Sequence, residues 1–170
     1  MLVVGLGKKE SLTVDVVREA VGLGVRAAKG MRAKKMAMVA LGCGAGGLNV
    51  ESGVEAACEA AHLASYIFDG WKKKEKDTPP KLEQLVIVEL DSKKAREVSR
   101  AVLSGTRNAT ATILARDLVN ESAFHMRPKD LKNVAEEIAK SSSRIKLKVF
   151  DRAGAKKLGM DAFLAVAQGS

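Results

Sequence analysis

Residues 36–71, MAMVALGCGAGGLNVESGVEAACEAAHLASYIFDGW, decide the fold. The run Met36–Leu41 has the length and the apolar content of a buried strand. A glycine-rich turn follows it, and Asn49 can then cap a helix that runs to about Trp71. A strand followed by a turn and a helix is the first half of a βαβ unit, so this stretch predicts a parallel sheet.

The same alternation of strand and helix continues on both sides of this stretch. Upstream, the apolar run Met1–Leu6 predicts another buried strand, and Ser11 or Thr13 can cap a helix that ends at Gly30. Downstream, Leu82–Leu90 predicts a third strand. Parallel strands are joined by right-handed helical crossovers that lie on the sheet faces. The expected fold class is therefore α/β, with α/β/α layers and a mostly parallel sheet.

The remainder of the chain is mainly helical in pattern. Asp91-Ser92 opens a very long helical pattern that reaches Asn120, after which a loop leads to a shorter helix beginning at Pro128. Residues 145–149 alternate apolar side chains with lysines, which predicts a strand with one solvated face. Two short elements are predicted last, a helix at about 153–158 and an apolar segment at 162–166.

The composition is that of a soluble globular domain with an excess of positive charge. Hydrophobic residues make up 46% and charged residues 29% of 170 residues, and the net charge is +9. Such a charge favours anionic partners, but the lysines and arginines are scattered and few aromatic residues lie among them. A solvated surface and a nucleic-acid face both remain open as interpretations. No apolar run approaches the roughly 20 residues needed to span a bilayer, so no membrane association is expected.

Residues capable of metal or nucleophilic chemistry are sparse. His62 and His125 are the only histidines, and neither has a carboxylate or cysteine at ligand spacing, so both are expected at the surface or the edge of the core. Cys43 and Cys58 are too few for a disulfide framework and are interpreted as small buried residues of a reducing compartment. No G-x-S-x-G elbow is present.

Two glycine-containing loops are candidates for binding phosphate. The first contains four glycines between a strand and a helix, where backbone N–H groups can cradle an anion. These are Gly42, Gly44, Gly46 and Gly47. Their spacing differs from G-x-G-x-x-G and no Lys-Ser/Thr follows, so a flexible turn is the other interpretation. The second loop, Gly5–Lys9, has a pattern that is common in ordinary loops.

Five motifs occur in a fixed order along the chain. They are Val4–Lys9, Tyr66–Asp69, Asp117–Glu121 with Pro128 after it, Leu158–Met160, and Leu164–Ser170. In this order they resemble the leucyl aminopeptidase (cytosol aminopeptidase) family, which typically reads D-L-V-N-x-P at the third motif and L-x-A-V-G-Q-G-S at the last. The resemblance covers nearly all 170 residues.

The resemblance implies a division of the chain into three parts. Residues 1–91 correspond to a partial amino-terminal α/β domain similar to macro domains, 92–120 to an interdomain helix, and 121–170 to the truncated opening segment of the catalytic domain. Members of the family bind two divalent metals, zinc, manganese or magnesium, through Lys, Asp and Glu residues beyond the last motif. The resemblance therefore carries no catalytic, cofactor-binding or metal-binding residue onto this chain, and we expect no cofactor in it.

We expect the chain to be a non-catalytic fragment or truncated paralogue of a two-metal exopeptidase that removes amino-terminal residues from peptides. Alone it is expected to be inactive, and to serve scaffolding and oligomer assembly in the cytoplasm or an organellar matrix. The family forms hexamers, so a homo-oligomer or a larger assembly is expected. The alternative is a structural or nucleic-acid-binding subunit of a larger assembly, which the net charge favours.

Several residues depart from the family pattern. Arg127 stands before Pro128 where threonine often caps the helix, and loss of such a cap costs about 1 kcal/mol. Ser122 replaces a usual proline, Phe124 a common asparagine, and Ala167 a glycine. These departures favour a fragment or degenerate paralogue over a working enzyme.

Overall fold

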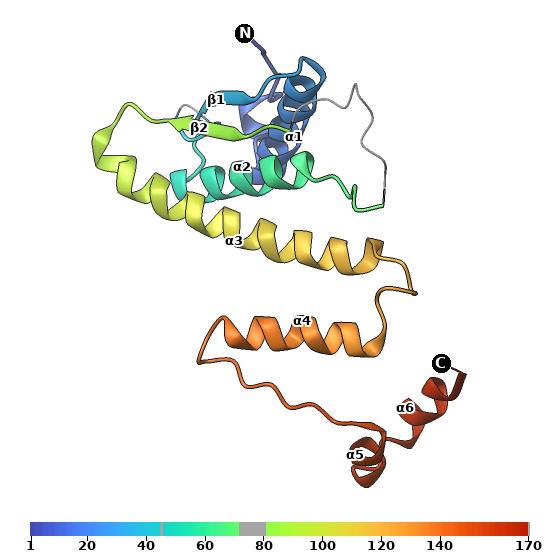
Figure 1. The fold of residues 1–170 in the computed structure, drawn as a ribbon. Coiled ribbons are helices and arrows are strands. Elements are labelled where there is room, and N and C mark those ends of the chain that lie inside the picture. The colour runs from blue at the N-terminus through green and yellow to red at the C-terminus, as the bar shows by residue number, and fades with distance from the viewer. Residues whose placement is uncertain (45, 72–80, 170) are drawn as a thin grey trace. The chain divides into compact units, whose positions relative to one another are not determined.

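A computed structural model describes residues 1–44, 46–71 and 81–169 (Figure 1). They fall into two compact units, Met1–Asn120 and Glu121–Ser170. No helix among the described residues is long and apolar enough to cross a membrane.

The described residues of the first unit form two parallel strands and three α-helices. Its elements in chain order are η1 (Lys9–Ser11), α1 (Val14–Gly30), β1 (Lys35–Val39), α2 (Val50–Ser65), β2 (Gln84–Val88), η2 (Ser92–Lys94) and α3 (Ala95–Asn120). β1 and β2 pair in register from Lys35 opposite Gln84 to Val39 opposite Val88. The two strands predicted at 36–41 and 82–90 are confirmed, and so is the α/β class.

Side-chain caps fix where the helices begin. Thr13, and not Ser11, caps α1, because its Oγ1 accepts a hydrogen bond from the backbone N of Val16 at 3.4 Å. Asn49 caps α2 by accepting from Ser52 N at 3.2 Å. The side chain of Asp91 accepts a hydrogen bond from the backbone N of Lys93. This contact caps the 3₁₀ turn η2, which precedes α3. These contacts satisfy backbone donors that the first turn of a helix leaves unpaired.

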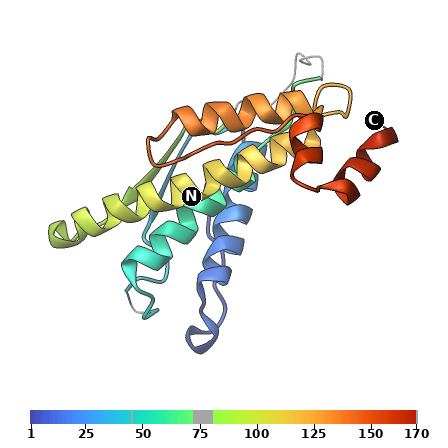
Figure 2. The same ribbon diagram turned by 90° about the horizontal axis from the view of Figure 1, so that it is seen from below.

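Alternate side chains of the strands face the helices and form the core. Met36 and Met38 of β1 pack with Leu85 of β2 against the buried valines of α1 and the alanines of α2. Ile87 packs instead on a second cluster formed by α2 and α3. Figure 2 shows α2 between α1 and α3. The central helix α2 therefore contributes to both clusters.

Helices α2 and α3 approach one another closely over small residues. Ala101, Gly105 and Ala109 of α3 are buried at this crossing. A Cβ added at Gly105 would lie 2.9 Å from the Cβ of Cys58 and still closer to the backbone oxygen of Glu55. Only a glycine therefore fits at this point without moving a helix.

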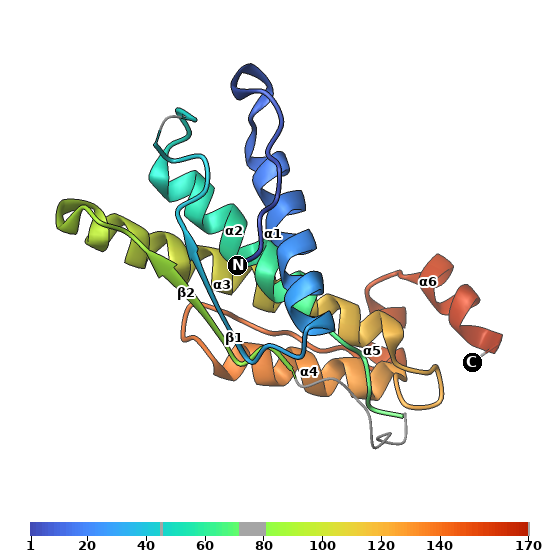
Figure 3. The ribbon, with the colours of Figure 1, turned by 90° about the horizontal axis from the view of Figure 1, so that it is seen from above.

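The opposite face of the two-stranded sheet carries no helix of the described residues. Val39, Val86 and Val88 project there and are 60%, 40% and 43% exposed. Figure 3 shows the strands lying over the three helices of this unit. Of the α/β/α layers expected from the sequence, the described residues therefore form the sheet and one helical layer, and no second helical layer.

The strand predicted at Met1–Leu6 is wrong for the described structure. These residues form no strand and make no backbone hydrogen bond with another described residue. Leu2 and Val3 are 44% and 78% exposed, although the Leu2 side chain lies beside Gly24 of α1. An apolar run becomes a strand only when a neighbouring edge pairs with its backbone, and the sequence pattern does not supply that partner.

The second unit contains only helices and connecting segments among its described residues. Its elements are α4 (Pro128–Lys140), α5 (Arg152–Lys157), α6 (Asp161–Val166) and η3 (Ala167–Gly169). The helices predicted from Pro128 and near 153–158 are confirmed, and the apolar segment 162–166 is helical. The strand predicted at 145–149 is wrong, because no described strand pairs with these residues and their apolar side chains are exposed.

The start of α4 compensates in part for the missing threonine cap. Arg127 occupies the cap position. Its backbone N and its Nε donate hydrogen bonds to the carboxylate of Asp130, at 3.1 Å and 3.2 Å. These bonds lower the pKa of Asp130, with the backbone hydrogen bond as the largest cause. One half of a capping box is therefore retained.

Candidate functional site

No cluster of metal ligands forms among the described residues. Residues 1–44, 46–71 and 81–169 contain no group of three or more His, Cys, Asp or Glu side chains that could hold a metal ion. His62 lies on α2 with Nε2 3.4 Å from Oγ1 of Thr106, and His125 lies against the ring of Phe124. His62 thus belongs to the first unit and His125 to the second.

The glycine loop after β1 is packed by its own chain. The backbone N–H of Leu48 donates to the carbonyl of Gly42, and that of Gly47 donates to Gly44. The Leu12 side chain fills the space beside Gly42 and Gly46, where an added Cβ would lie 3.0 Å or less from it. Donors that already have internal partners are not available to cradle a phosphate, so this geometry favours the turn interpretation.

The second loop also offers no cradle. Gly7 has φ of +75°, a conformation that favours glycine, and the chain then enters the short 3₁₀ turn η1. A Cβ added at Gly5 or Gly7 would meet no described atom within 4 Å. No described side chain therefore packs against the Cβ position of either glycine, and Gly7 permits the turn that precedes η1.

The two cysteines are free thiols in the first unit. Cys58 is buried in the cluster between α2 and α3, and burial raises its pKa to about 11. Cys43 is half-buried and donates to the carbonyl oxygen of Leu41 at 3.3 Å, and burial also raises its pKa. A thiol with a raised pKa is a poor nucleophile near neutral pH, so both agree with the interpretation as small packed residues.

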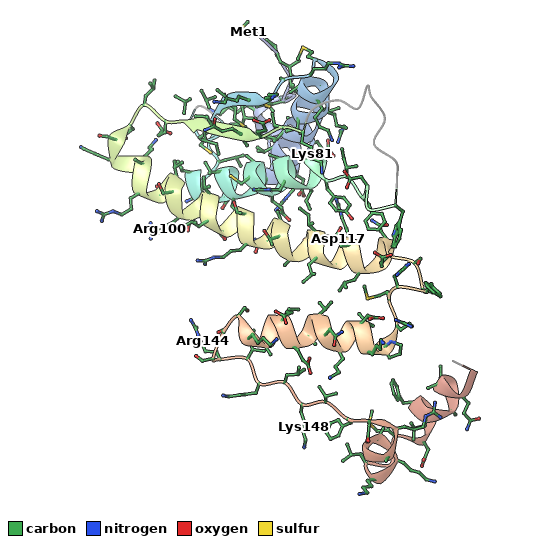
Figure 4. All side chains as sticks on the ribbon, viewed as in Figure 1. Met1, Lys81, Arg100, Asp117, Arg144 and Lys148 are labelled. Atoms are coloured by element: carbon green, nitrogen blue, oxygen red, sulfur yellow. The ribbon has the colours of Figure 1, made fainter. Side chains whose placement is uncertain are left out.

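A hydrogen-bonded junction joins two of the motifs singled out in the sequence. The hydroxyl of Tyr66 donates to Oδ1 of Asp117 at 2.6 Å, and Nδ2 of Asn120 donates to the same hydroxyl at 3.1 Å. Arg116 lies over the Tyr66 ring and donates to the carbonyl of Leu63 at 3.3 Å. Desolvation, followed by the bond to Asp117, raises the pKa of Tyr66. Figure 4 shows Asp117 facing the segment that follows α2.

The junction explains why α2 ends early. The helix predicted to reach about Trp71 stops at Ser65, and Tyr66 has extended backbone angles of −58° and 135°. Leaving the helix brings the Tyr66 ring to α3, where it finds hydrogen-bonding partners 51 and 54 residues away in sequence. Sequence reasoning identified both motifs but could not show that they touch.

Three arginines line the free face of α3. Arg96, Arg100 and Arg107 are separated by four and seven residues, which places them within about 40° of one another around a helix. All three are exposed, lie opposite the face of α3 that packs on α2, and form no ion pair with a described residue. Figure 4 shows Arg100 on the side turned away from α2. We call these residues the arginine stripe.

A groove lies along the first unit at the free edge of β2. It measures about 710 Å³ and runs between β2, α2 and α3. Its apolar lining includes Leu85, Ile87, Val98 and Val102, and its polar lining includes Thr106. Because the sheet of the described residues has the order β1-β2, the outer edge of β2 beside this groove has no strand on it.

Comparisons with known proteins place these features in a family. A model of the cytosol aminopeptidase family, N-terminal domain, matches residues 1–75, and a model of the catalytic domain of the same family matches 113–170. A probable cytosol aminopeptidase of Alkaliphilus oremlandii is 31% identical over 170 residues, which is all of this chain and 34% of the relative. One of Agrobacterium fabrum is 36% identical over 180 residues and is covered to 33%. The chain thus spans about a third of the length of the curated relatives that it matches.

Solved structures agree with this assignment. The bottromycin maturation enzyme BotP has a TM-score of 0.76 and 28% identity, with 92% of this chain and 31% of BotP covered. BotP in complex with Mn gives a TM-score of 0.74 and 29% identity. The described residues of this chain do not fit a two-metal site, because their candidate ligands do not cluster, so no metal-assisted step is assigned to them. The matches to both domain models and along the full length of the chain show that it belongs to the cytosol aminopeptidase family.

Proposed function

We propose that this chain is a non-catalytic part of an aminopeptidase, in which it serves as scaffolding for the catalytic polypeptide and for oligomer assembly. The observation that carries the proposal is the contrast between its two units. The first unit has two buried clusters, whereas the second has Ala155 as its one buried hydrophobic residue among those described. A unit without a core needs other polypeptide to bury its apolar side chains.

The helix α4 offers a surface on which such polypeptide can pack. Leu131, Val134 and Ile138 recur at helical spacing along one stripe of α4, yet Leu131 and Ile138 remain exposed. The opposite side of the helix carries Asn133 and charged residues. An amphipathic helix whose apolar stripe is uncovered is suited to packing against a further element of the catalytic domain.

A split-enzyme experiment tests this role. The chain would be co-expressed with the remaining two-thirds of a cytosol aminopeptidase relative, and co-purification measured together with release of leucine from a leucyl substrate in the presence of manganese. We expect a stable complex from the wild-type chain, no complex from Leu131→Asp, and an unaffected complex from the control Asn133→Asp on the opposite side of α4. If the chain alone releases leucine in a manganese-dependent manner, the proposal is wrong.

The names of similar proteins support proposals for the cellular location of the assembly and for the polypeptide that binds its metal. Their name, cytosol aminopeptidase, supports a cytoplasmic location for the assembly. A divalent metal would be bound by the catalytic polypeptide, in keeping with the manganese complex of BotP.

A second candidate function rests on the arginine stripe. Three exposed guanidinium groups on one helix face, together with a net charge of +9, suit a nucleic-acid backbone. Binding of a labelled DNA duplex would be measured by anisotropy over a salt series. Replacing all three arginines with glutamine should flatten the salt dependence by about 0.9 in log–log slope for each phosphate that is no longer neutralised. A control removes three other charges, from Lys129, Lys156 and Lys157. Equal effects of the two variants would exclude a specific face.

A further inference from the structure

We propose that a hollow between helices α1, α2 and α3 of the first unit binds a phosphate group. The hollow measures about 340 Å³, and the residues that line it include Arg18, Arg26 and Arg116. We call it the three-arginine hollow. Its lining residues lie between positions 18 and 116, so neither end of the chain contributes to it. The inference goes beyond the proposed scaffolding role and does not depend on it.

Small residues leave the space for the hollow. Gly22 of α1 lines it together with Ala60 and Ala64 of α2. Figure 2 shows these two helices beside one another. Long side chains at the three positions would fill the gap between the helices, whereas a glycine and two alanines leave it open.

The side chain of Arg26 is folded over Gly22. The three atoms nearest to a Cβ added at Gly22 all belong to the Arg26 guanidinium group, with Nη1 at 3.4 Å. Side chains on a helix point toward its amino terminus, so Arg26 reaches the residue four positions before it. Its charge therefore lies on the side of Arg18, which is a further four positions back along α1.

Arg18 is held in one orientation by two carboxylates. Its Nε and Nη2 lie 3.1 Å and 3.0 Å from Oε2 of Glu59, and its Nη1 donates to Oδ1 of Asp15 at 2.8 Å. These contacts leave some N–H donors of the guanidinium group unused. Arg18 can therefore donate to a ligand without first having to be ordered.

Arg116 reaches the hollow from α3. Its Nη1 donates to the carbonyl of Leu63 at 3.3 Å, and its guanidinium carbon lies 5.7 Å from the centre of the Tyr66 ring. Leu63 itself also lines the hollow. The two contacts hold the Arg116 side chain against α2, so a third guanidinium group is positioned from a second direction.

The three-arginine hollow has an excess of positive charge. Glu19 and Glu59 are its only carboxylates among the described residues that line it. Glu59 is already paired with Arg18, and Glu19 is exposed. Arg26 and Arg116 form no ion pair with a described residue. Guanidinium groups bind oxyanions through paired N–H donors, so these two arginines are available for an anionic ligand.

The number of arginines favours a phosphate group over a carboxylate. A phosphate monoester offers three acceptor oxygens and close to two negative charges, whereas a carboxylate offers two oxygens and one charge. Donors that come from different helices suit a ligand whose oxygens point in several directions. The volume is near the lower end of the range for small-ligand sites, so it admits free phosphate or the phosphomonoester of a small metabolite.

Isothermal titration calorimetry of the chain at low ionic strength tests the proposal. Inorganic phosphate should bind saturably at one site per chain. Arg26→Gln and Arg116→Gln should each weaken binding at least tenfold. The control Arg107→Gln removes the same charge from the free face of α3 and should change the affinity less than twofold. Equal weakening in the control would mean that phosphate responds only to the net charge of +9, and would overturn the site. No saturable binding up to about 10 mM phosphate would also overturn it.

Two further variants separate loss of binding from loss of folding. Gly22→Leu places an apolar side chain where Arg26 lies, so it should abolish phosphate binding while Tm, measured by circular dichroism, does not fall. Glu19→Gln removes a carboxylate from the lining and should tighten binding, a gain that misfolding cannot produce. Unchanged affinity in both variants would contradict the assignment.

A second titrant distinguishes the two sources of the phosphate group. Tighter binding of glycerol 2-phosphate than of inorganic phosphate would assign the hollow to a phosphomonoester, and equal or weaker binding would assign it to free phosphate. The split-enzyme complex can form whether or not phosphate binds, so its failure is a separate result.

Discussion

Replacing Gly105 by alanine should destabilise the first unit, although alanine is the better helix former. The added Cβ would lie 2.9 Å from the Cβ of Cys58 and would meet the backbone oxygen of Glu55 still more closely. Ordinary contact begins near 3.4 Å, so α2 and α3 must separate by several tenths of an ångström or more. Overpacking of this kind costs about 3 kcal/mol at the upper end of its usual range. Alanine regains about 1 kcal/mol of helix propensity, which leaves a net loss of about 2 kcal/mol.

Thermal unfolding followed by circular dichroism measures this loss. A net change of about 2 kcal/mol corresponds to a fall in Tm of about 4–8 °C for a chain of this size. Gly22→Ala in α1 is the matched control, because its Cβ would meet only the guanidinium end of Arg26 at 3.4 Å, which can move aside. That control should raise Tm by about 2–4 °C. If Gly105→Ala is as stable as the wild type, the close crossing of α2 and α3 described above is incorrect.

Three further outcomes are expected. Val54→Ala removes a fully buried side chain and should cost about 2–3 kcal/mol in urea unfolding, while a cost below about 1 kcal/mol would show that the site is loosely packed. Tyr66 is the only tyrosine, so its ultraviolet titration reports one group; its pKa should lie above the ordinary value and fall in Asp117→Asn, and an unchanged midpoint would contradict the hydrogen bond. Because burial raises the pKa of Cys58 from 9.0 to about 11, stability from its neutral thiol is present below pH 9 and is lost as the pH rises toward 11. Cys58→Ala should therefore lose less stability than the wild type over this interval, and equal losses would assign the effect to other groups.

Local patterns predicted the elements whose limits are set by nearby residues. β1 and β2 follow from apolar runs bounded by turns, and Thr13 and Asn49 cap helices as short polar residues do when backbone donors are unpaired. The alternation of strand and helix was enough to predict their parallel pairing.

The errors arose where a distant partner decides the structure. Met1–Leu6 and residues 145–149 have the composition of strands, but a strand also requires a neighbouring edge, and local composition does not reveal whether one is present. The end of α2 was misplaced because Tyr66 leaves the helix to reach Asp117, which lies 51 residues away.

The candidate surfaces were visible only in part. The arginine stripe could be found in the sequence by applying the helical period to α3, once its packing face was known, but counting scattered charges concealed it. The groove at β2 combines three separate elements, so no single stretch of sequence indicates it.

Because α3 is long, a small tilt at its crossing with α2 changes the position of its carboxyl end. At 1.5 Å per residue its 26 residues extend about 39 Å, and Gly105 lies a little before its midpoint. From Gly105 to Asn120 is about 22 Å, so a tilt of about 5° at the close crossing would displace the carboxyl end of the helix by roughly 2 Å. The hydrogen bonds of Tyr66 to Asp117 and Asn120 hold the carboxyl end of α3 against the segment that follows α2. The close contact at Gly105 and the hydrogen bond at Tyr66 thereby fix the direction of α3 within the first unit.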